Sequence, residues 1–407
     1  MITSLLGPRS GGFRRLWLAT LISLLGTWTA AVVLPLRVYD ATGSTVWVSA
    51  LLLAELVPGA LVGLVFANRL SRLSPRAALI AADVAGAAVY LSLVWVRSPW
   101  PTFALALIAG FAVGIYRPLV TAVTPRMVTD SDLEAANASL SIVESGAMVV
   151  GQGLGGLLFV AAGPQLALGL NCGSFLCSAA LVAGVSNLPG SPERIVRRMP
   201  LAQLRHAARL VRATPGLVQP AVIWPVCCLF LGISLALTIP LVRMALSGSP
   251  LEVGLAQAAI SAGLVAGSAV SVRLRGVLSA WFPGVLAAMG ACVVAAGLAP
   301  WYLLALPVLA GVGLANGLAL VHVRSALQRG ADADELPALA AFVVSCVFTA
   351  TAAGSLLGGV AADIGSLRVT FAAAGWGVVM TAAGSAALAA RVRASDATLE
   401  YRQDDRG

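Results

Sequence analysis

The sequence predicts an all-α integral membrane protein in which twelve transmembrane helices form two related six-helix bundles. Three observations lead to this fold class. The 407 residues are 59% apolar and only 11% charged, whereas soluble proteins are roughly 25% charged. Apolar segments of about 20 residues, the length that crosses the hydrocarbon of a bilayer, recur along the whole chain. The two halves of the chain also share a repeated pattern.

The apolar segments predict the helices one by one. In chain order they are Leu16–Leu36, Val46–Ala67, Ala77–Val96, Thr102–Val123, Ala138–Ala162, Gln165–Val185, Pro220–Val242, Val253–Val272, Val277–Ala299, Trp301–Val323, Leu336–Ala362 and Val369–Ala390.

Arginine placement predicts the orientation, because cytoplasmic loops keep an excess of positive charge. All 26 basic residues are arginine, and with a cytoplasmic N-terminus twenty of them fall on that side. The opposite side keeps Arg37, Arg97, Arg243 and Arg368. We therefore expect both termini in the cytoplasm and the chain in a bacterial inner membrane.

The longest interruption between apolar segments divides the chain into six helices plus six. The sequence predicts an N-terminal bundle, a cytoplasmic linker, a C-terminal bundle and a cytoplasmic tail, at residues 1–186, 187–219, 220–390 and 391–407. Within the linker, Leu204 and Val211 share one helical face while Arg205 and Arg209 share another. Such a helix either lies along the anionic leaflet or forms a solvated linker, with His206 at its surface.

An internal repeat relates the two halves. The segment "LPLRVYDATGS" at Leu34–Ser44 aligns with "IPLVRMALSGS" at Ile239–Ser249, and Thr124–Ala135 aligns with Leu327–Ala338. Two matching halves in the same orientation require a pseudo-two-fold axis along the membrane normal.

At these residues the chain resembles the major facilitator superfamily over nearly its whole length. Within that superfamily, "FRRLWLATLISLLGTW", "PRMVTDSDLEAANASLS" and "GLGGLLFVAAGPQLALGLNCGSFLCSAALV" are similar to macrolide-efflux and enterobactin-exporter-like permeases. The resemblance implies the major facilitator fold, export as the direction of transport, and alternating access.

Several motifs of the resembled family are altered. In the loop between helices two and three, Asn68 stands where the family has an acid, while Arg69 and Arg72 remain. These arginines either latch one closed state or only anchor the loop in the cytoplasm. In helix one the acid of the "GDW" pattern is replaced by Thr27, so no proton site is expected there.

Helix five carries a glycine-rich motif, Gly151, Gly155 and Gly156, in which Gln152 replaces the family's proline. With Gly153 these glycines also match the G-x-G-x-x-G pattern of dinucleotide folds, but that pattern needs a preceding strand. Within an apolar span, glycines instead allow close approach of helices. We expect them to pack against the opposing half where the cavity closes.

Ionisable groups inside spanning helices are costly and mark functional sites by default. Glu55 lies near the middle of the second span, and a carboxyl group held away from water can load and release a proton near neutral pH. Alternatively, Glu55 is a neutral acid that joins two helices. Arg117 and Glu144 lie at similar depths and are expected to form an ion pair, either a breakable one at the inner mouth or a static one. For Asp83 we favour pairing with Arg69 or Arg72 over a role in transport.

Further candidates line the expected cavity. His322 ends helix ten and titrates in the physiological range, or else it caps the helix. Trp28, Gln152 and Asn316 can stack against or hydrogen-bond a ligand.

The sequence thus predicts a transporter rather than an enzyme. It contains no lysine and therefore no P-loop for ATP, so the expected driving force is proton antiport. The few charges in the cavity favour an amphipathic small molecule as substrate: a drug, siderophore or natural product. The alternative is a lipid or lysophospholipid flippase of the same fold. We expect a monomer in the lipid bilayer, without cofactor, metal site or nucleic-acid partner.

Overall fold

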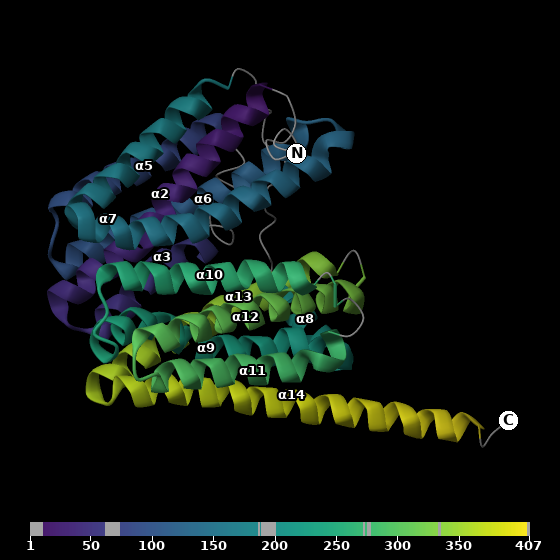
Figure 1. Ribbon diagram of the computed structural model, residues 1–407. Coiled ribbons are helices and arrows are strands. Elements are labelled where there is room, and N and C mark those ends of the chain that lie inside the picture. The colour runs from purple at the N-terminus through teal and green to yellow at the C-terminus, as the bar shows by residue number, and fades with distance from the viewer. Residues whose placement is uncertain are drawn as a thin grey trace. The chain divides into compact units, whose positions relative to one another are not determined.

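The computed structural model describes residues 11–61, 74–185, 188, 201–271, 273–274, 278–332 and 335–404, and the regular elements in these ranges are helical (Figure 1). The long helices are α2 (Gly11–Thr42), α3 (Thr45–Leu61), α5 (Pro75–Trp95), α6 (Pro99–Val123), α7 (Leu133–Ala183), α8 (Leu201–Ala213), α9 (Trp224–Pro240), α10 (Pro250–Ser271), α11 (Leu278–Leu298), α12 (Tyr302–Gly330), α13 (Leu336–Ile364) and α14 (Leu367–Asp404). Short 3-10 turns lie at η2 (Thr124–Arg126), η3 (Asp130–Asp132) and η4 (Pro215–Leu217), and π-helical turns at η5 (Gln219–Ile223) and η6 (Leu241–Ala245).

Within the described ranges, ten helices are long and apolar enough to cross a membrane. Two of the predicted spans, Ala138–Ala162 and Gln165–Val185, appear as the single element α7, which is kinked at Gly163. Gly163 has φ 79° and ψ 166°, a left-handed backbone that glycine adopts without strain. Pro164 follows and disfavours helical geometry at the residue before it. The kink therefore lies where the sequence places the break between two spans.

Helix α5 shows how local sequence sets a helix start. Ser74 precedes it in extended conformation, and its side-chain oxygen accepts a hydrogen bond from the Ala77 backbone N–H at 3.2 Å. Pro75 occupies the first helical position, where its missing N–H costs nothing. A serine N-cap followed by proline thus fixes the start of α5.

The chain forms two compact units. Unit 1 comprises Met1–Arg198 and Thr238–Ser261, and unit 2 comprises Met199–Leu237 and Ala262–Gly407. The sequence places the division only at the linker. The difference is Thr238–Ser261, which holds the end of α9, all of η6 and the first half of α10 and groups with unit 1.

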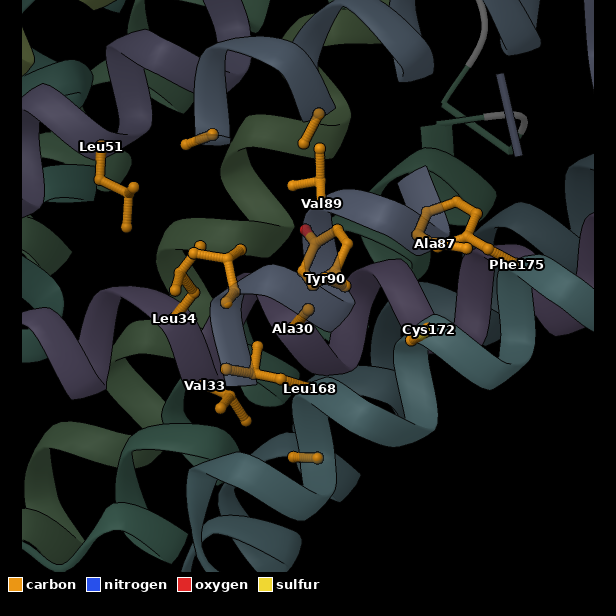
Figure 2. Packing of buried hydrophobic residues seen from close by; sticks show 14 of the residues in the cluster. Ala30, Val33, Leu34, Leu51, Ala87, Val89, Tyr90, Leu168, Cys172 and Phe175 are labelled. Atoms are coloured by element: carbon orange, nitrogen blue, oxygen red, sulfur yellow. The ribbon is translucent and has the colours of Figure 1, made fainter. Parts of the chain in front are cut away.

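Unit 1 is built around apolar clusters shared by α2, α3, α5, α6 and α7. Figure 2 shows one of them, in which Tyr90 of α5 lies among Leu34 of α2, Leu51 of α3 and Leu168 of α7. Tyr90 also stacks on Phe175 of α7, with ring centroids 5.7 Å apart. These contacts fix the level at which α5 and α7 meet.

Unit 2 packs its helices through glycine. Gly354 of α13 lies directly against the Leu229 carbonyl of α9, and Gly263 of α10 lies against the Ala310 carbonyl of α12. Helices α11 and α14 also run side by side (Figure 1). Small residues let helix backbones approach closely where lipid offers no hydrophobic drive for association.

The linker helix predicted from its amphipathic pattern is present as α8. It packs on α13, and Ala207 and Val211 are buried while Arg205 and Arg209 are exposed. At these positions protein covers its apolar face, which favours the linker interpretation over a helix lying on the bilayer. At the other end of unit 2, α14 continues through much of the predicted tail to Asp404 (Figure 1).

Candidate functional site

A chain of buried polar side chains crosses unit 1 near one end of its helices. Ser178 of α7 donates a hydrogen bond to Asp83 Oδ2 of α5 at 2.7 Å, and the Tyr116 hydroxyl of α6 lies 3.2 Å from the Ser178 hydroxyl. Three helices therefore contribute to one polar layer in an otherwise apolar region.

Hydrogen-bond directions follow from the number of protons available. Ser178 has one hydroxyl proton, which it gives to Asp83, so it accepts from Tyr116. Asp83 is 1% exposed, and its second oxygen, Oδ1, has no hydrogen-bond partner among the described residues. A buried polar atom without a partner needs an explanation such as an ordered water or a bound proton.

A small cavity adjoins this layer. It measures about 20 Å³, counted as the space open to the centre of a water molecule, which is enough for about one water. Its lining comes from α2, α5, α6 and α7 and consists of Ser23, Leu24, Thr27, Ala82, Asp83, Ala112, Val113, Tyr116, Arg117 and Phe175. The cavity is too small for an amphipathic substrate.

The expected ion pair between Arg117 of α6 and Glu144 of α7 is present in the structure. The two side chains are 47% and 51% exposed within the structure. Arg117 is therefore bonded to Glu144 and also lines the cavity that Asp83 lines.

Glu55 lies in a different part of unit 1. It belongs to α3, is half-buried, and interacts electrostatically with Tyr90 of α5. Helix α6 approaches its backbone, since a β-carbon on Gly110 would lie 2.7 Å from the carbonyl oxygens of both Ala54 and Glu55. Glu55 is therefore held at a tight crossing of α3 and α6.

Phe175 separates Glu55 from Asp83. On α5, Asp83, Gly86 and Tyr90 are spaced by three and four residues and so share one face. A β-carbon on Gly86 would lie 3.2 Å from three ring atoms of Phe175, so the ring rests on Gly86. The same ring stacks on Tyr90 and lines the cavity beside Asp83, placing an apolar layer between the two acids.

Two arginines hold the carbonyl end of α7. Arg15 of α2 bonds to the Gly184 carbonyl, and Arg76 of α5 bonds to the Ala183 carbonyl. Cations at a helix C-terminus satisfy free carbonyls and the helix dipole. The predicted latch residues Asn68, Arg69 and Arg72 lie outside the described residues.

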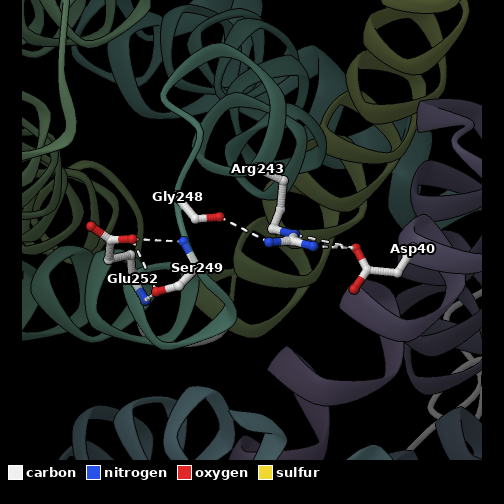
Figure 3. A network of polar contacts seen from close by, with 5 residues as sticks. All are labelled: Asp40, Arg243, Gly248, Ser249 and Glu252. Atoms are coloured by element: carbon white, nitrogen blue, oxygen red, sulfur yellow. Dashed lines mark hydrogen bonds and ion pairs between the residues drawn. The ribbon is translucent and has the colours of Figure 1, made fainter.

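The two copies of the sequence repeat meet in an ion pair. Arg243 of η6 bonds to Asp40 of α2 through Nε at 3.2 Å and Nη2 at 3.1 Å, and its Nη1 reaches the Gly248 carbonyl at 2.9 Å (Figure 3). Glu252 caps the start of α10 by accepting from Ser249 N and Oγ at 2.6 and 2.9 Å. Asp40 and Arg243 come from Leu34–Ser44 and Ile239–Ser249, the segments related by the repeat.

The glycines of helix five have two different partners. Gly151 and Gly155 lie against α2, with β-carbons that would be 2.8 Å from Trp28 Cβ and 2.6 Å from the Thr29 carbonyl. Gly156 lies against α10 at Gly254. The expectation that all three face the second half of the chain therefore holds in the structure for Gly156, whereas Gly151 and Gly155 serve packing within the first half.

Gln152 makes a contact of its own. It is buried, and its Oε1 accepts a hydrogen bond of 2.6 Å from the Ser261 hydroxyl of α10. Its oxygen is thus engaged by protein. Trp28 of α2 has a buried indole N–H without a partner among the described residues, so this donor is available for a ligand or water.

In unit 2, His322 belongs to a second buried chain. It is 4% exposed, lies 3.3 Å from Gln219 Oε1, and stacks on Phe282 with centroids 4.4 Å apart. Gln219 in turn donates to Ser385 of α14 at 3.4 Å. Asn316, on the same helix as His322, is half-buried. The histidine is enclosed by its own unit, which favours a structural link between α12 and α14.

Sequence reasoning missed the partners of these groups. Tyr116 directly precedes Arg117 and Ser178 sits among small residues, so neither stands out in a pattern. Asp40 and Arg243 lie at helix ends where charges are common. Among the described residues, no group of three His, Cys, Asp or Glu side chains is placed to hold a metal ion.

Ten helices of spanning length among the described residues, with acids and an arginine inside them, indicate a multi-pass membrane protein. The sequence comparison gives the family. The model of the Major Facilitator Superfamily matches residues 16–338, and the chain belongs to this superfamily of transporters. No curated protein matches the chain by sequence.

Solved transporters share the fold. The nucleoside transporter NupG superposes with a TM-score of 0.71 at 13% identity, covering 93% of this chain and 99% of that one. A bacterial homolog of the human lysosomal transporter Spinster, inward-facing and unoccupied, gives 0.69 at 13%, covering 94% and 97%. A POT family transporter in complex with a thioalcohol-conjugated peptide gives 0.70 at 11%, covering 96% and 99%. At these identities the likeness concerns the fold.

Proposed function

We propose that the protein is a twelve-helix transporter of the bacterial inner membrane that exports an amphipathic small molecule in exchange for protons. The observation that carries the proposal is the set of acids within apolar helices, Glu55 of α3, Asp83 of α5 and Glu144 of α7, in a chain that belongs to a transporter superfamily. Ionisable groups at such depth are costly and mark ion or substrate pathways. Both termini face the cytoplasm, and a monomer is sufficient for the cycle.

Alternating access is supported by contacts that can open and close. Asp40–Arg243, Gln152–Ser261 and Gly156–Gly254 join helices of the first half to the segment Thr238–Ser261. In the proposed cycle these contacts break when the transporter opens where they lie. Arg243 is then hydrated.

The class of substrate is proposed from the small number of charged side chains in the spanning helices. Among the spanning helices that the structure describes, Arg117–Glu144 and Asp40–Arg243 form ion pairs, and the two charges of each pair neutralise one another. An apolar antibiotic or secreted natural product suits such a lining, in keeping with the resemblance to macrolide-efflux and enterobactin-exporter-like permeases.

The first experiment identifies the transported compound. An efflux-deficient bacterial host expressing the protein is challenged with macrolides, siderophores and apolar dyes, and the compound that gives resistance is loaded into proteoliposomes. A pH gradient should drive its movement. Labelled phospholipid and lysophospholipid are tested in the same vesicles; movement of lipid but of none of the compounds would replace the exporter by a flippase.

Glu55 is proposed as a proton site of this exchange. Glu55→Gln keeps the shape of the side chain but cannot ionise, so transport driven by the pH gradient should fall at least tenfold while counterflow exchange of the same compound continues. Glu134→Gln in the first turn of α7, an exposed acid, is the matched control. Undiminished gradient-driven transport by Glu55→Gln would remove Glu55 from the mechanism.

A further inference from the structure

We infer that Asp83 is a second proton-binding site, and that Arg117 displaces its proton by leaving Glu144 for the Asp83 carboxylate. The proton site follows from the geometry of unit 1 alone. Its use in transport rests on the proton exchange proposed above.

The Asp83 side chain is buried without full compensation. The side chain is 1% exposed, one oxygen is bonded to Ser178, and the other has no partner among the described residues. An ionised carboxylate in this setting lacks the compensation that a buried charge requires. The neutral acid fits better, with its proton on Oδ1.

Groups from three neighbouring helices, α2, α6 and α7, surround Asp83. From α6 come Tyr116 and Arg117, and from α7 come Ser178 and Phe175; α2 contributes the uncharged Thr20, Ser23 and Thr27. On α5 itself, Arg76 lies two turns away and is bonded to the Ala183 carbonyl. Among the described lining residues, Arg117 is therefore the cation placed to compensate an ionised Asp83.

Arg117 already has a partner in this structure, Glu144. It is paired with Glu144, so in this structure its charge is used and Asp83 stays neutral. Both Asp83 and Arg117 line the same small cavity. In the inferred second arrangement the long arginine side chain turns from Glu144 to Asp83.

Charge is conserved in the exchange. In the first arrangement Asp83 carries the proton, and Arg117 and Glu144 neutralise one another. When Arg117 moves to Asp83, the O–H bond at Oδ1 breaks, the proton is released to solvent water, and the new ion pair is neutral. Glu144 keeps its negative charge and, being 51% exposed, is hydrated. Release of one proton accompanies the rearrangement of α6 against α7.

Infrared titration of the purified full-length protein tests the proton site without any substrate. The wild type should show a carboxylic-acid C=O band that disappears as the pH is raised, and Asp83→Asn should lack one component of it. Glu55→Gln is the matched control, because it removes a different acid and must leave the Asp83 component in place. Identical difference spectra for wild type and Asp83→Asn would overturn the inference.

The pH at which the Asp83 component titrates tests whether Arg117 exchanges Glu144 for Asp83. Arg117→Gln removes the cation that competes with the proton, so the Asp83 component should persist to a higher pH by at least one unit. Glu144→Gln frees Arg117 and should shift the component to a lower pH. An Asp83 component that titrates at the same pH in all three proteins would show that Arg117 does not displace the proton.

A folding control and a transport arm complete the design. Each variant is compared with the wild type by Tm and gel filtration, and Tyr116→Phe supplies a second, shape-preserving perturbation, which should move the Asp83 component because it removes the donor to Ser178. If the wild type moves no compound with a pH gradient yet shows the Asp83 component, the proposed exchange fails while the proton site stands.

Discussion

Asp83 and Glu144 are acids of helices long enough to span a membrane, Glu55 belongs to the shorter apolar helix α3, and each acid has a different environment. Glu144 is paired with an arginine and half-exposed, Asp83 is bonded to a serine and buried, and Glu55 lies beside Tyr90 at a crossing of α3 and α6. Sequence placed all three within apolar spans. Their different partners follow from which helix lies opposite, and that information is tertiary.

The Arg117–Glu144 pair leads to a prediction at this scale. Reversal of either charge alone, Arg117→Glu or Glu144→Arg, places like charges together and should reduce transport by about tenfold or more, because close charged residues couple by about 0.5–3 kcal/mol. The double reversal should restore a large part of the activity. Transport of the resistance compound in proteoliposomes measures this, and a double variant as inactive as the single ones would count against a functional pair.

Gln152 offers a test of a single hydrogen bond. Ser261→Ala removes the donor to Gln152 Oε1, leaving a buried acceptor unpaired at a cost of about 1–3 kcal/mol. The closed arrangement of α7 and α10 should weaken, seen as faster thiol labelling of a cysteine placed at Ala258 beside Gly153. Ser345→Ala, whose hydroxyl bonds only within its own helix at Ala341, is the control and should leave labelling unchanged.

At the scale of elements, glycines decide how closely helices approach. Apolar segments and the break between the spans Ala138–Ala162 and Gln165–Val185 could be predicted from the sequence. The sequence could not predict which helix each glycine contacts, because a glycine in an apolar span looks the same whichever neighbour it packs against. Gly151 and Gly155 turned out to face α2 and Gly156 to face α10.

The crossing of α3 and α6 gives a prediction on stability. A β-carbon on Gly110 would lie 2.7 Å from two backbone carbonyl oxygens of α3, and backbone cannot move aside as a side chain can. Gly110→Ala should therefore lower the Tm of the purified protein by several degrees and impair transport through displacement of Glu55. Gly173→Ala is the matched control, since Gly173 is exposed with open space at its β-carbon.

The control substitution should behave in the opposite way. Alanine at an open helical position gains up to about 1 kcal/mol in helix propensity over glycine, so Gly173→Ala should leave the Tm unchanged or raise it. Equal Tm values for Gly110→Ala and the wild type would mean that α3 and α6 are not in contact as described.

For the whole molecule, the internal repeat has a physical counterpart. The repeat copies at Leu34–Ser44 and Ile239–Ser249 meet through Asp40 and Arg243 (Figure 3). In the proposed cycle this pair must separate. Cysteines at positions 40 and 243, joined by a thiol cross-linker in a background without the native cysteines, should abolish transport, and cleavage of the cross-link should restore it. Full transport by the cross-linked protein would show that these segments need not part.

The sequence by itself determined the membrane class, the superfamily, the repeat and most helix positions, because spanning length, arginine bias and glycine-proline breaks are local properties of a chain in a bilayer. It also selected the acids, since an ionisable residue in an apolar span is conspicuous. Only the tertiary structure decided that Asp83 shares a cavity with Arg117, that Phe175 stands between Asp83 and Glu55, and that His322 is enclosed by Gln219 and Phe282. The reason is that these contacts join residues far apart in the chain, and the face that a helix presents to its neighbour depends on the packing of the whole bundle.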